Sequence, residues 1–175
     1  MKKINSIIAI ATLSIAFLTT ASAQTATATA TASATIVTPI TIAKVTDMVF
    51  GNVAVLASLG TVVMEPTSAA ARSTTGTVTI AAANAGSPTA AKFTVSGEGT
   101  YAYTITLPSS ASLTGPGTAM TVDTFTTSIG TDLTLGALSG GTQTVYVGAT
   151  LHVGGSQTAG AYTTTTPFSV TVAYN

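Results

Sequence analysis

The 175-residue chain has no cysteine, no tryptophan and one histidine, and only 6% of its residues are charged. Without cysteine it has no disulfide, no thiolate zinc site and no cysteine nucleophile. Five basic residues are balanced by five acidic ones, so no basic patch is available to bind nucleic-acid phosphates. With 46% hydrophobic residues, the chain is too apolar for charge-driven disorder. We therefore expect a folded protein that is not an enzyme, uses no cofactor and binds no nucleic acid.

Residues 1–23 have the pattern of a secretory signal peptide, with cleavage predicted before Gln24. Lys2 and Lys3 precede an apolar run over 4–18, and the small residues 21–23 complete the pattern. The run is shorter than the roughly 20 residues of a membrane-spanning helix, and no basic stop-transfer segment follows it. We expect export through the periplasm to the cell surface or the medium, with no membrane span after cleavage.

Apolar and polar residues alternate with a period of two through most of the remaining chain, and helical periodicity is nearly absent. The alternating segments are rich in β-branched and aromatic residues, which favour strands. Turns containing Gly and Pro separate them. Many short strands with such breaks predict an all-β, antiparallel sandwich or barrel. The expected strands span 33–44, 48–55, 61–65, 76–81, 92–96, 100–107, 119–125, 132–138, 142–153 and 166–174.

The alternation assigns an inward and an outward face to these strands. In 142–153 the expected inward residues are Val145, Val147, Ala149, Leu151 and Val153. In 166–174 they are Phe168, Val170, Val172 and Tyr174. The outward faces carry Thr rather than Lys and Glu. Charged edge residues usually prevent pairing between molecules, so their scarcity suits a protein that packs against copies of itself.

Residues 24–37 form an N-terminal extension ahead of the expected sandwich domain, 38–175. From Ala26 to Ile36 its even positions are apolar, all of them Ala except Ile36, and most of its odd positions are Thr or Ser. The alternation continues in one phase to Ile42, and at about 3.3 Å per residue its roughly eighteen residues would extend for about 60 Å, much longer than a typical strand. Three interpretations stay open: a strand donated to a neighbouring subunit, a disordered low-complexity stalk, and a strand within its own domain. The donated face would consist of Ala26, Ala28, Ala30, Ala32, Ala34 and Ile36.

Few residues have the chemistry of a catalytic site. His152 is expected to be solvated on an outward face, and a Ser–His–Asp triad would need Asp47, Asp123 or Asp132 beside it. No Gly-x-Ser-x-Gly motif supports such a triad, and the acidic residues have no paired-carboxylate or calcium-loop spacing. We therefore expect no catalytic residue, no cofactor-binding residue and no metal ligand.

Two aromatic residues and one turn allow further interpretations. Tyr101 and Tyr103 could line a sugar-binding face, although the alternation favours a place in the core. Glu98, between two glycines, is expected in a hairpin turn rather than in a phosphate-binding loop.

Several sequence blocks resemble one bacterial secreted family, the domain of unknown function 4402. They are ATIVTPITI at 34–42, VFGNVAV at 49–55, GTVV at 60–63, FTVSG at 93–97, YTITLP at 103–108, AGAY at 159–162 and FSVTVAY at 168–174. The last two blocks are also similar to the ends of spore-coat-U-type and archaic chaperone–usher pilus subunits. The matching residues there are Gly160, Tyr162, Phe168, Val170, Val172 and Tyr174.

The resemblance implies an immunoglobulin-like β-sandwich that lacks one strand. A periplasmic chaperone would supply the missing strand first, contacting the edge strand at Phe168, Val170, Val172 and Tyr174, and an outer-membrane usher would direct assembly. The N-terminal arm of the next subunit would then replace the chaperone. The expected function is a pilin-like structural subunit of a homopolymeric surface filament or fimbria. The alternative is a monomeric secreted or surface-attached β-sandwich that binds a ligand such as a carbohydrate.

Overall fold

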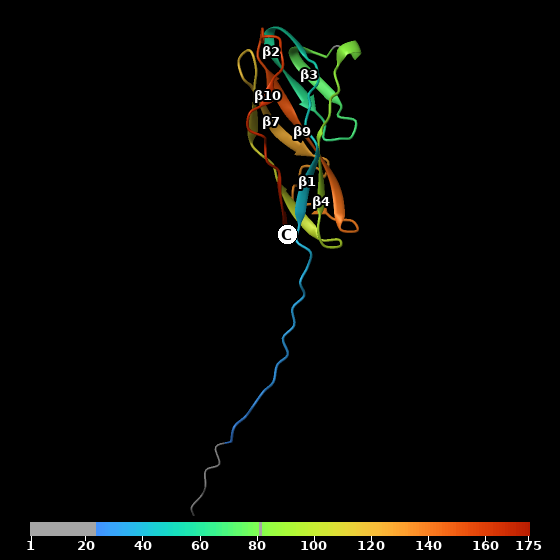
Figure 1. Cartoon of the computed structure of the whole chain (residues 1–175), viewed down its shortest axis with the longest axis vertical. Helices are drawn as coiled ribbons and strands as arrows, with labels where there is room; N and C mark the ends of the chain where they lie inside the picture. Colours follow the sequence, from blue (N-terminus) through green and yellow to red (C-terminus); the bar gives the residue numbers. More distant parts are fainter. Residues whose placement is uncertain (1–23, 81) are drawn as a thin grey trace, which may run out of the picture. The chain divides into compact units, whose positions relative to one another are not determined.

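The computed structural model describes residues 24–80 and 82–175 (Figure 1). The predicted signal peptide, 1–23, lies outside the described residues. The chain divides into two units after Thr35. The second unit, from Ile36 to Asn175, contains all the strands of the described chain.

The second unit has the predicted fold class, because its described residues form antiparallel strands and one short 3-10 turn, with no α-helix. The bounds are β1 (Thr41–Thr46), β2 (Ala54–Met64), β3 (Arg72–Thr79), η1 (Ala82–Asn84), β4 (Ala91–Ser96), β5 (Ala102–Thr106), β6 (Ser110–Thr114), β7 (Met120–Thr127), β8 (Gly136–Ala137), β9 (Thr142–Val153), β10 (Thr163–Thr164) and β11 (Thr171–Tyr174).

The strands form two antiparallel sheets in a curled sandwich. The larger sheet has the order β1-β4-β9-β7-β6-β10, with β2 paired to β9 and β3 paired to β2. The smaller sheet has the order β11-β5-β8. Figure 1 shows β9 running through the domain, with β4 beside its first half and β2 and β7 beside its second half. Its 12 residues therefore tie the two halves of the larger sheet together.

The predicted inward face of β9 is confirmed. Its exposed fraction is 1% at Val145, 0% at Val147, 1% at Ala149, 2% at Leu151 and 3% at Val153. The first two of these side chains belong to a core cluster that includes β4 and β5, and the last three to a cluster that includes β2 and β7. One alternating strand thus supplies both halves of the core.

Several expected strands have different limits. The segment 48–55 is mostly irregular, with a single bridge between Val49 and Thr89, because the backbone at Gly51 has a φ of +69° that interrupts an extended strand. The segment 132–138 contains only the two residues of β8, and 166–174 contains only the four of β11. The expected set omits β6 and β10. The loop around Glu98 connects strands of different sheets, so the predicted hairpin turn there is wrong.

The described part of the first unit, residues 24–35, has an extended sequence pattern but no strand pairing. Each of these residues is exposed. The strand expected over 33–44 begins only at Thr41. Pro39 explains in part why the strand begins later than expected, because proline has no N–H to donate to a neighbouring strand. The three interpretations of the extension stay predictions.

Candidate functional site

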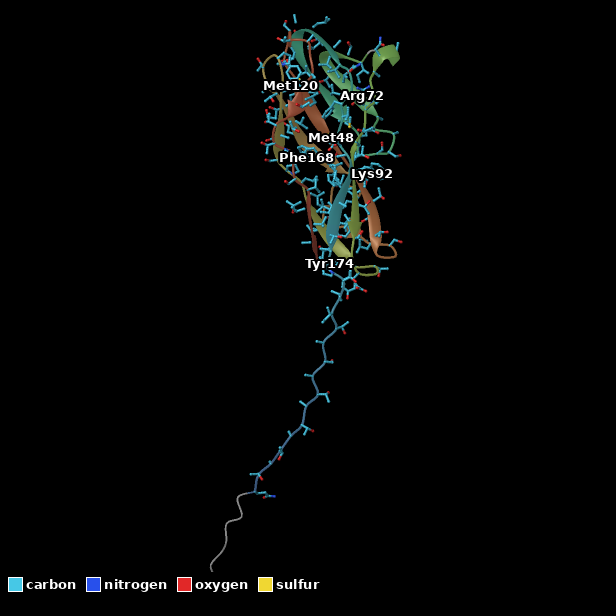
Figure 2. The ribbon with its side chains drawn as sticks, in the orientation of Figure 1. Met48, Arg72, Lys92, Met120, Phe168 and Tyr174 are labelled. Carbon is cyan, nitrogen blue, oxygen red and sulfur yellow. The ribbon has the colours of Figure 1, made fainter. Side chains whose placement is uncertain are left out.

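An apolar groove of about 900 Å³ opens on the second unit. One wall is the stretch 42–53, which carries the chain from β1 toward β2, and the other is the stretch 160–170, which approaches β11. Met120, Val122 and Leu151 lie on its floor, and each is at least nine-tenths buried. Figure 2 labels Met48, Met120 and Phe168, which come from the two walls and the floor.

The second wall contains a backbone segment without partners. Residues 165–170, called here the edge segment, form no backbone hydrogen bond and no strand pair within the described chain. On either side of it, β10 pairs with β6 and β11 pairs with β5. The edge segment therefore leaves N–H and C=O groups available along the groove, which is the arrangement that accepts an added strand.

Of the four predicted edge residues, Val172 and Tyr174 belong to β11, whereas Phe168 and Val170 lie in the edge segment before it. Val170 is 9% exposed, and the side chains of Phe168, Val172 and Tyr174 are partly buried against the second core cluster. Phe168 contacts Phe125 with ring centroids 5.1 Å apart. Strand β11 is an edge of the smaller sheet, because β5 is its single partner among the described strands.

The groove carries little net charge. Lys44 and Asp47 are its charged lining residues, and their Nζ and Oδ1 atoms are 2.6 Å apart in an exposed ion pair. The remaining lining residues are apolar or carry hydroxyl, amide or backbone groups. A ligand that fits this surface would be uncharged and extended.

Two side chains hold the walls in place, Arg72 from outside the groove lining and Tyr162 from within the second wall. Arg72, at the start of β3, donates from Nη1 to the carbonyl oxygen of Phe50 and from Nη2 to that of Ala85, the latter at 3.3 Å. The Tyr162 hydroxyl donates to the carbonyl oxygen of Thr158 at 2.8 Å and accepts the N–H of Gly117 at 2.9 Å. Sequence reasoning missed the role of Arg72, because nothing in a strand sequence indicates that a cation binds carbonyl groups of a distant loop.

The predicted donor face is not paired with any strand. Ala26, Ala28, Ala30, Ala32 and Ala34 are exposed in the first unit, and Ile36, the first residue of the second unit, is 98% exposed. An isoleucine with almost its whole surface in water is costly, since burying such a side chain is worth about 1.5–3 kcal/mol. The intermolecular interpretation of this face stays a prediction.

Three residues close to the start of the sandwich form a hydrogen-bonded group that we call the clasp. The Thr38 N–H donates to Oε2 of Glu98 at 2.8 Å, and the Tyr174 hydroxyl donates to the Thr38 carbonyl oxygen at 2.8 Å. The Glu98 N–H donates to the same hydroxyl at 2.5 Å. The bond from the Thr38 backbone lowers the pKa of the Glu98 carboxyl below its usual value.

His152 lies on the outward face, as predicted. Its Nε2 is 2.9 Å from Oδ1 of Asp123 on the neighbouring strand β7, and both side chains are solvent-exposed to a third or more. This hydrogen bond, followed by one from Thr124, lowers the pKa of the Asp123 carboxyl. The structure thus brings together two of the four residues considered for a triad. Exposed pairs of this kind contribute little to stability.

The other candidates have local roles. Asp132 accepts the hydroxyl of Thr134 at 2.6 Å and its N–H at 3.0 Å, as in a turn cap, and the hydroxyl bond lowers the pKa of this carboxyl. Tyr103 is fully buried, so the core position favoured by the alternation is confirmed for it. Tyr101 is 46% exposed and its ring contacts that of Tyr174 edge-on.

The described residues contain no cluster of three or more His, Cys, Asp or Glu side chains suited to a metal ion. Within the same part of the chain, no helix has the length and apolar character needed to cross a membrane.

One family model matches the chain, from residue 40 to residue 174. The matched range includes every strand from β1 to β11 and both walls of the groove, and the predicted donor face lies before it. No curated protein and no solved structure matches the chain. Because the match covers most of the chain, the protein belongs to the family described as a domain of unknown function, DUF4402.

Proposed function

We propose that this protein is a non-enzymatic structural subunit of an extracellular filament, and that residues 24–36 of one subunit occupy the groove of the next. The observation that carries the proposal is the unpaired edge segment beside an apolar groove. A sandwich with such an opening has room for one more strand. The added strand would continue the smaller sheet beyond β11.

The extension is long enough to span the second wall of the groove. The wall from residue 160 to residue 170 would be about 35 Å long if fully extended, and the extension from 24 to 36 about 40 Å, at roughly 3.3 Å per residue. The extension contains no charged residue, and the charges of Lys44 and Asp47 at the groove compensate each other. An uncharged strand therefore enters without leaving a buried charge unpaired.

The alternation of the extension matches the two sides of an added strand. Its even residues would face the groove floor, and its Thr and Ser residues would continue the Thr-rich outer surface. The floor side chains are already at least nine-tenths buried, so small methyl groups suit the remaining space. Five Ala methyls contribute about 4 kcal/mol at about 0.8 kcal/mol each, and Ile36 adds about 1.5–3 kcal/mol.

Backbone hydrogen bonds supply the rest of the interaction. In β-strand addition the main chain gives much of the affinity and the alternate side chains give the specificity. The edge segment offers its free N–H and C=O groups for this purpose. The extension can satisfy them, because residues 24–36 contain no proline and each of them has both an N–H and a C=O group.

Export and assembly partners belong to the same proposal. The signal peptide pattern supports passage through the periplasm to the cell surface. A subunit with an open groove needs temporary cover before assembly, since exposed apolar surface and a free strand edge favour aggregation. A periplasmic chaperone at Phe168, Val170, Val172 and Tyr174, followed by an outer-membrane usher, would provide it.

A pair of single substitutions tests the proposal. Ala30→Asp places a carboxylate on the face that enters the groove, whereas Thr31→Asp places the same charge on the outward face. We expect the mature Ala30→Asp protein to stay monomeric in sedimentation analysis and Thr31→Asp to form polymers like the wild type. Deletion of residues 24–34 should also give monomers. Equal polymerisation of all three variants would refute the proposal.

A mature protein that forms no polymer at all would favour the alternative function. The groove would then serve as the ligand site of a monomeric surface module, and Ala30→Asp and Thr31→Asp would behave alike. Electron microscopy of the purified mature chain distinguishes these two outcomes directly.

A further inference from the structure

We infer that the clasp residues Thr38, Glu98 and Tyr174 make the groove accept the extension of a second copy rather than the extension of its own chain. This inference rests on the proposed function. A subunit with both an extension and a groove can bind either its own extension or that of a second copy. The two extensions have the same sequence, so something other than sequence must favour one of them.

The extension lies close enough along the chain to its own groove to enter it, an arrangement that we call self-closure. Thr38 is four residues before Ile42, a residue that lines the groove. The edge of β1 away from β4 has no strand partner in the described part of the chain. A tight turn at 36–39 would therefore be enough to lay residues 24–36 along their own domain.

The local sequence opposes such a turn. Ile36, Val37 and Thr38 are three consecutive β-branched residues, which rarely adopt the positive φ values of hairpin turns. Thr38 also precedes Pro39, and the residue before proline is restricted to extended conformations. None of the Gly, Asn or Asp residues that usually form tight turns occurs between 24 and 46.

The clasp fixes the same segment through its backbone. Both the N–H and the C=O of Thr38 are engaged, by Glu98 at 2.8 Å and by Tyr174 at 2.8 Å. A reversal of the chain at this residue would break both hydrogen bonds. The bond to the carboxylate is charge-assisted and hence stronger than a neutral one.

The Tyr174 ring is itself held in position. The ring of Tyr101 contacts it edge-on, with centroids 5.5 Å apart. Gly97 lies so close that a Cβ at that position would collide with the Tyr174 hydroxyl. The neighbouring Asn175 donates from Nδ2 to the Thr134 carbonyl oxygen at 3.0 Å, which anchors the end of β11.

The test introduces a hairpin turn and leaves residues 24–36 and the groove unchanged. The triple variant Val37→Asn, Thr38→Gly, Pro39→Thr supplies the Asn-Gly pair of a two-residue turn, and the reversal of the chain in that turn breaks both clasp bonds of the residue 38 backbone. Its control, Val37→Ser, Thr38→Ser, keeps Pro39 and supplies no hairpin turn. We expect the triple variant to be a monomer whose residues 24–36 resist proteolysis, whereas the control still forms polymers.

A second variant addresses the clasp alone. Tyr174→Phe with Glu98→Gln weakens both bonds to Thr38 without changing the turn sequence. We expect its monomer fraction to exceed that of the wild type by roughly fivefold, the size of effect typical of one net hydrogen bond. Gly97→Ala should act in the same direction, since it displaces the Tyr174 hydroxyl.

The outcomes separate this inference from the proposed function. If the wild type polymerises and the triple variant polymerises equally well, the inference is wrong and the filament function stands. If the triple variant is monomeric but its extension is digested as fast as a free chain, self-closure does not occur and the inference is also wrong. A wild type that never polymerises would overturn both.

Discussion

Strand β9 and the edge segment, 165–170, differ more in their partners than in their sequences. Strand β9 occupies the stretch 142–153, and residues 166–170 of the edge segment lie in the stretch 166–174; apolar residues alternate in both stretches. Strand β9 pairs with β4 and β2 on one edge and with β7 on the other. The edge segment has no strand partner in the described chain, and its Phe168 remains partly exposed. Alternation therefore indicates which face of a segment is buried, whereas pairing depends on what lies beside it.

Under the proposed function, this contrast suits one region to stability and the other to assembly. A strand paired on both edges has no free hydrogen-bonding groups to offer to another molecule. An unpaired segment beside an apolar groove has such groups. It breaks no hydrogen bond within its own domain when a strand of another molecule pairs with them. We expect substitutions in β9 to unfold the domain and substitutions in the edge segment chiefly to affect polymerisation.

The largest effect is expected from a charge inside β9. Val145→Asp places a carboxylate at a position that is 1% exposed, and an unpaired buried charge costs several kcal/mol. We expect loss of the cooperative unfolding transition in circular dichroism. The matched control is Thr144→Asp, on the outward face of the same strand, which should unfold like the wild type. A folded Val145→Asp domain would contradict the assignment of β9 to the core.

A smaller effect on folding is expected at the edge segment. Phe168→Ala removes a partly buried ring and its contact with Phe125, which should lower the free energy of unfolding by about 2 kcal/mol. The domain should stay folded as a monomer, while polymerisation is lost because the groove wall changes shape. Chemical denaturation and sedimentation measure the two effects separately. A Phe168→Ala domain that unfolds completely would show that the edge segment, like β9, is needed for folding and would contradict the comparison.

Alkaline pH should weaken the contact between the smaller sheet and β9. The Tyr103 hydroxyl donates to Oε1 of Gln143 at 2.5 Å, and burial raises the pKa of Tyr103 to about 12. A raised pKa means that folding favours the neutral phenol, so this stabilisation is complete below pH 10 and is lost as the pH rises toward 12. The loss should reach about 1 kcal/mol at pH 11. It should be absent in Tyr103→Phe, as urea unfolding at pH 9 and pH 11 would reveal.

Acid should release the clasp but leave β9 intact. The pKa of the Glu98 carboxyl is lowered by the Thr38 backbone bond, so the stabilisation is present above the usual carboxyl pKa and disappears as the pH falls through the lowered one. Hydrogen exchange of the Thr38 amide, corrected for its intrinsic pH dependence, should accelerate below that pKa. Glu98→Gln should remove the acid-dependent step, and the amides of β9 should not respond.

The smallest effect is expected from His152→Ala. The pair with Asp123 is exposed and lies on the outward face of β9, away from the groove. We expect no measurable change in the unfolding midpoint or in polymerisation. A clear loss of polymers in this variant would indicate that the Thr-rich outer face, rather than the groove, carries the subunit contact.

The sequence predicts best those strands whose partners lie within the same domain. The bounds of β9 coincide with the predicted 142–153 because its alternation is uninterrupted and its inner face is wholly buried. Strand β6 was missed because its Ser and Thr residues, at the edge of a turn-rich stretch, resemble a loop. It forms because β7 lies beside it, which is a tertiary effect.

The site was less predictable than the fold. The positions of Phe168 and Val170 follow from alternation, but the groove between them and Met48 depends on how two irregular segments pass over the sheet. The clasp joins Thr38 to Tyr174, residues 136 positions apart, and no local pattern indicates such a pair. The extension has the alternation of a strand, but residues 24–35 pair with no other strand in the described chain.

Hydrogen exchange of the edge segment in the polymer tests the central claim most directly. The mature wild-type polymer is compared with the monomeric Ala30→Asp protein, and the amides of 165–170 and of 24–36 are followed by mass spectrometry. We predict that both segments exchange rapidly in the monomer and become strongly protected together in the polymer, as expected for a strand added at that edge. Rapid exchange of the edge segment in polymers as well as in monomers would contradict the claim.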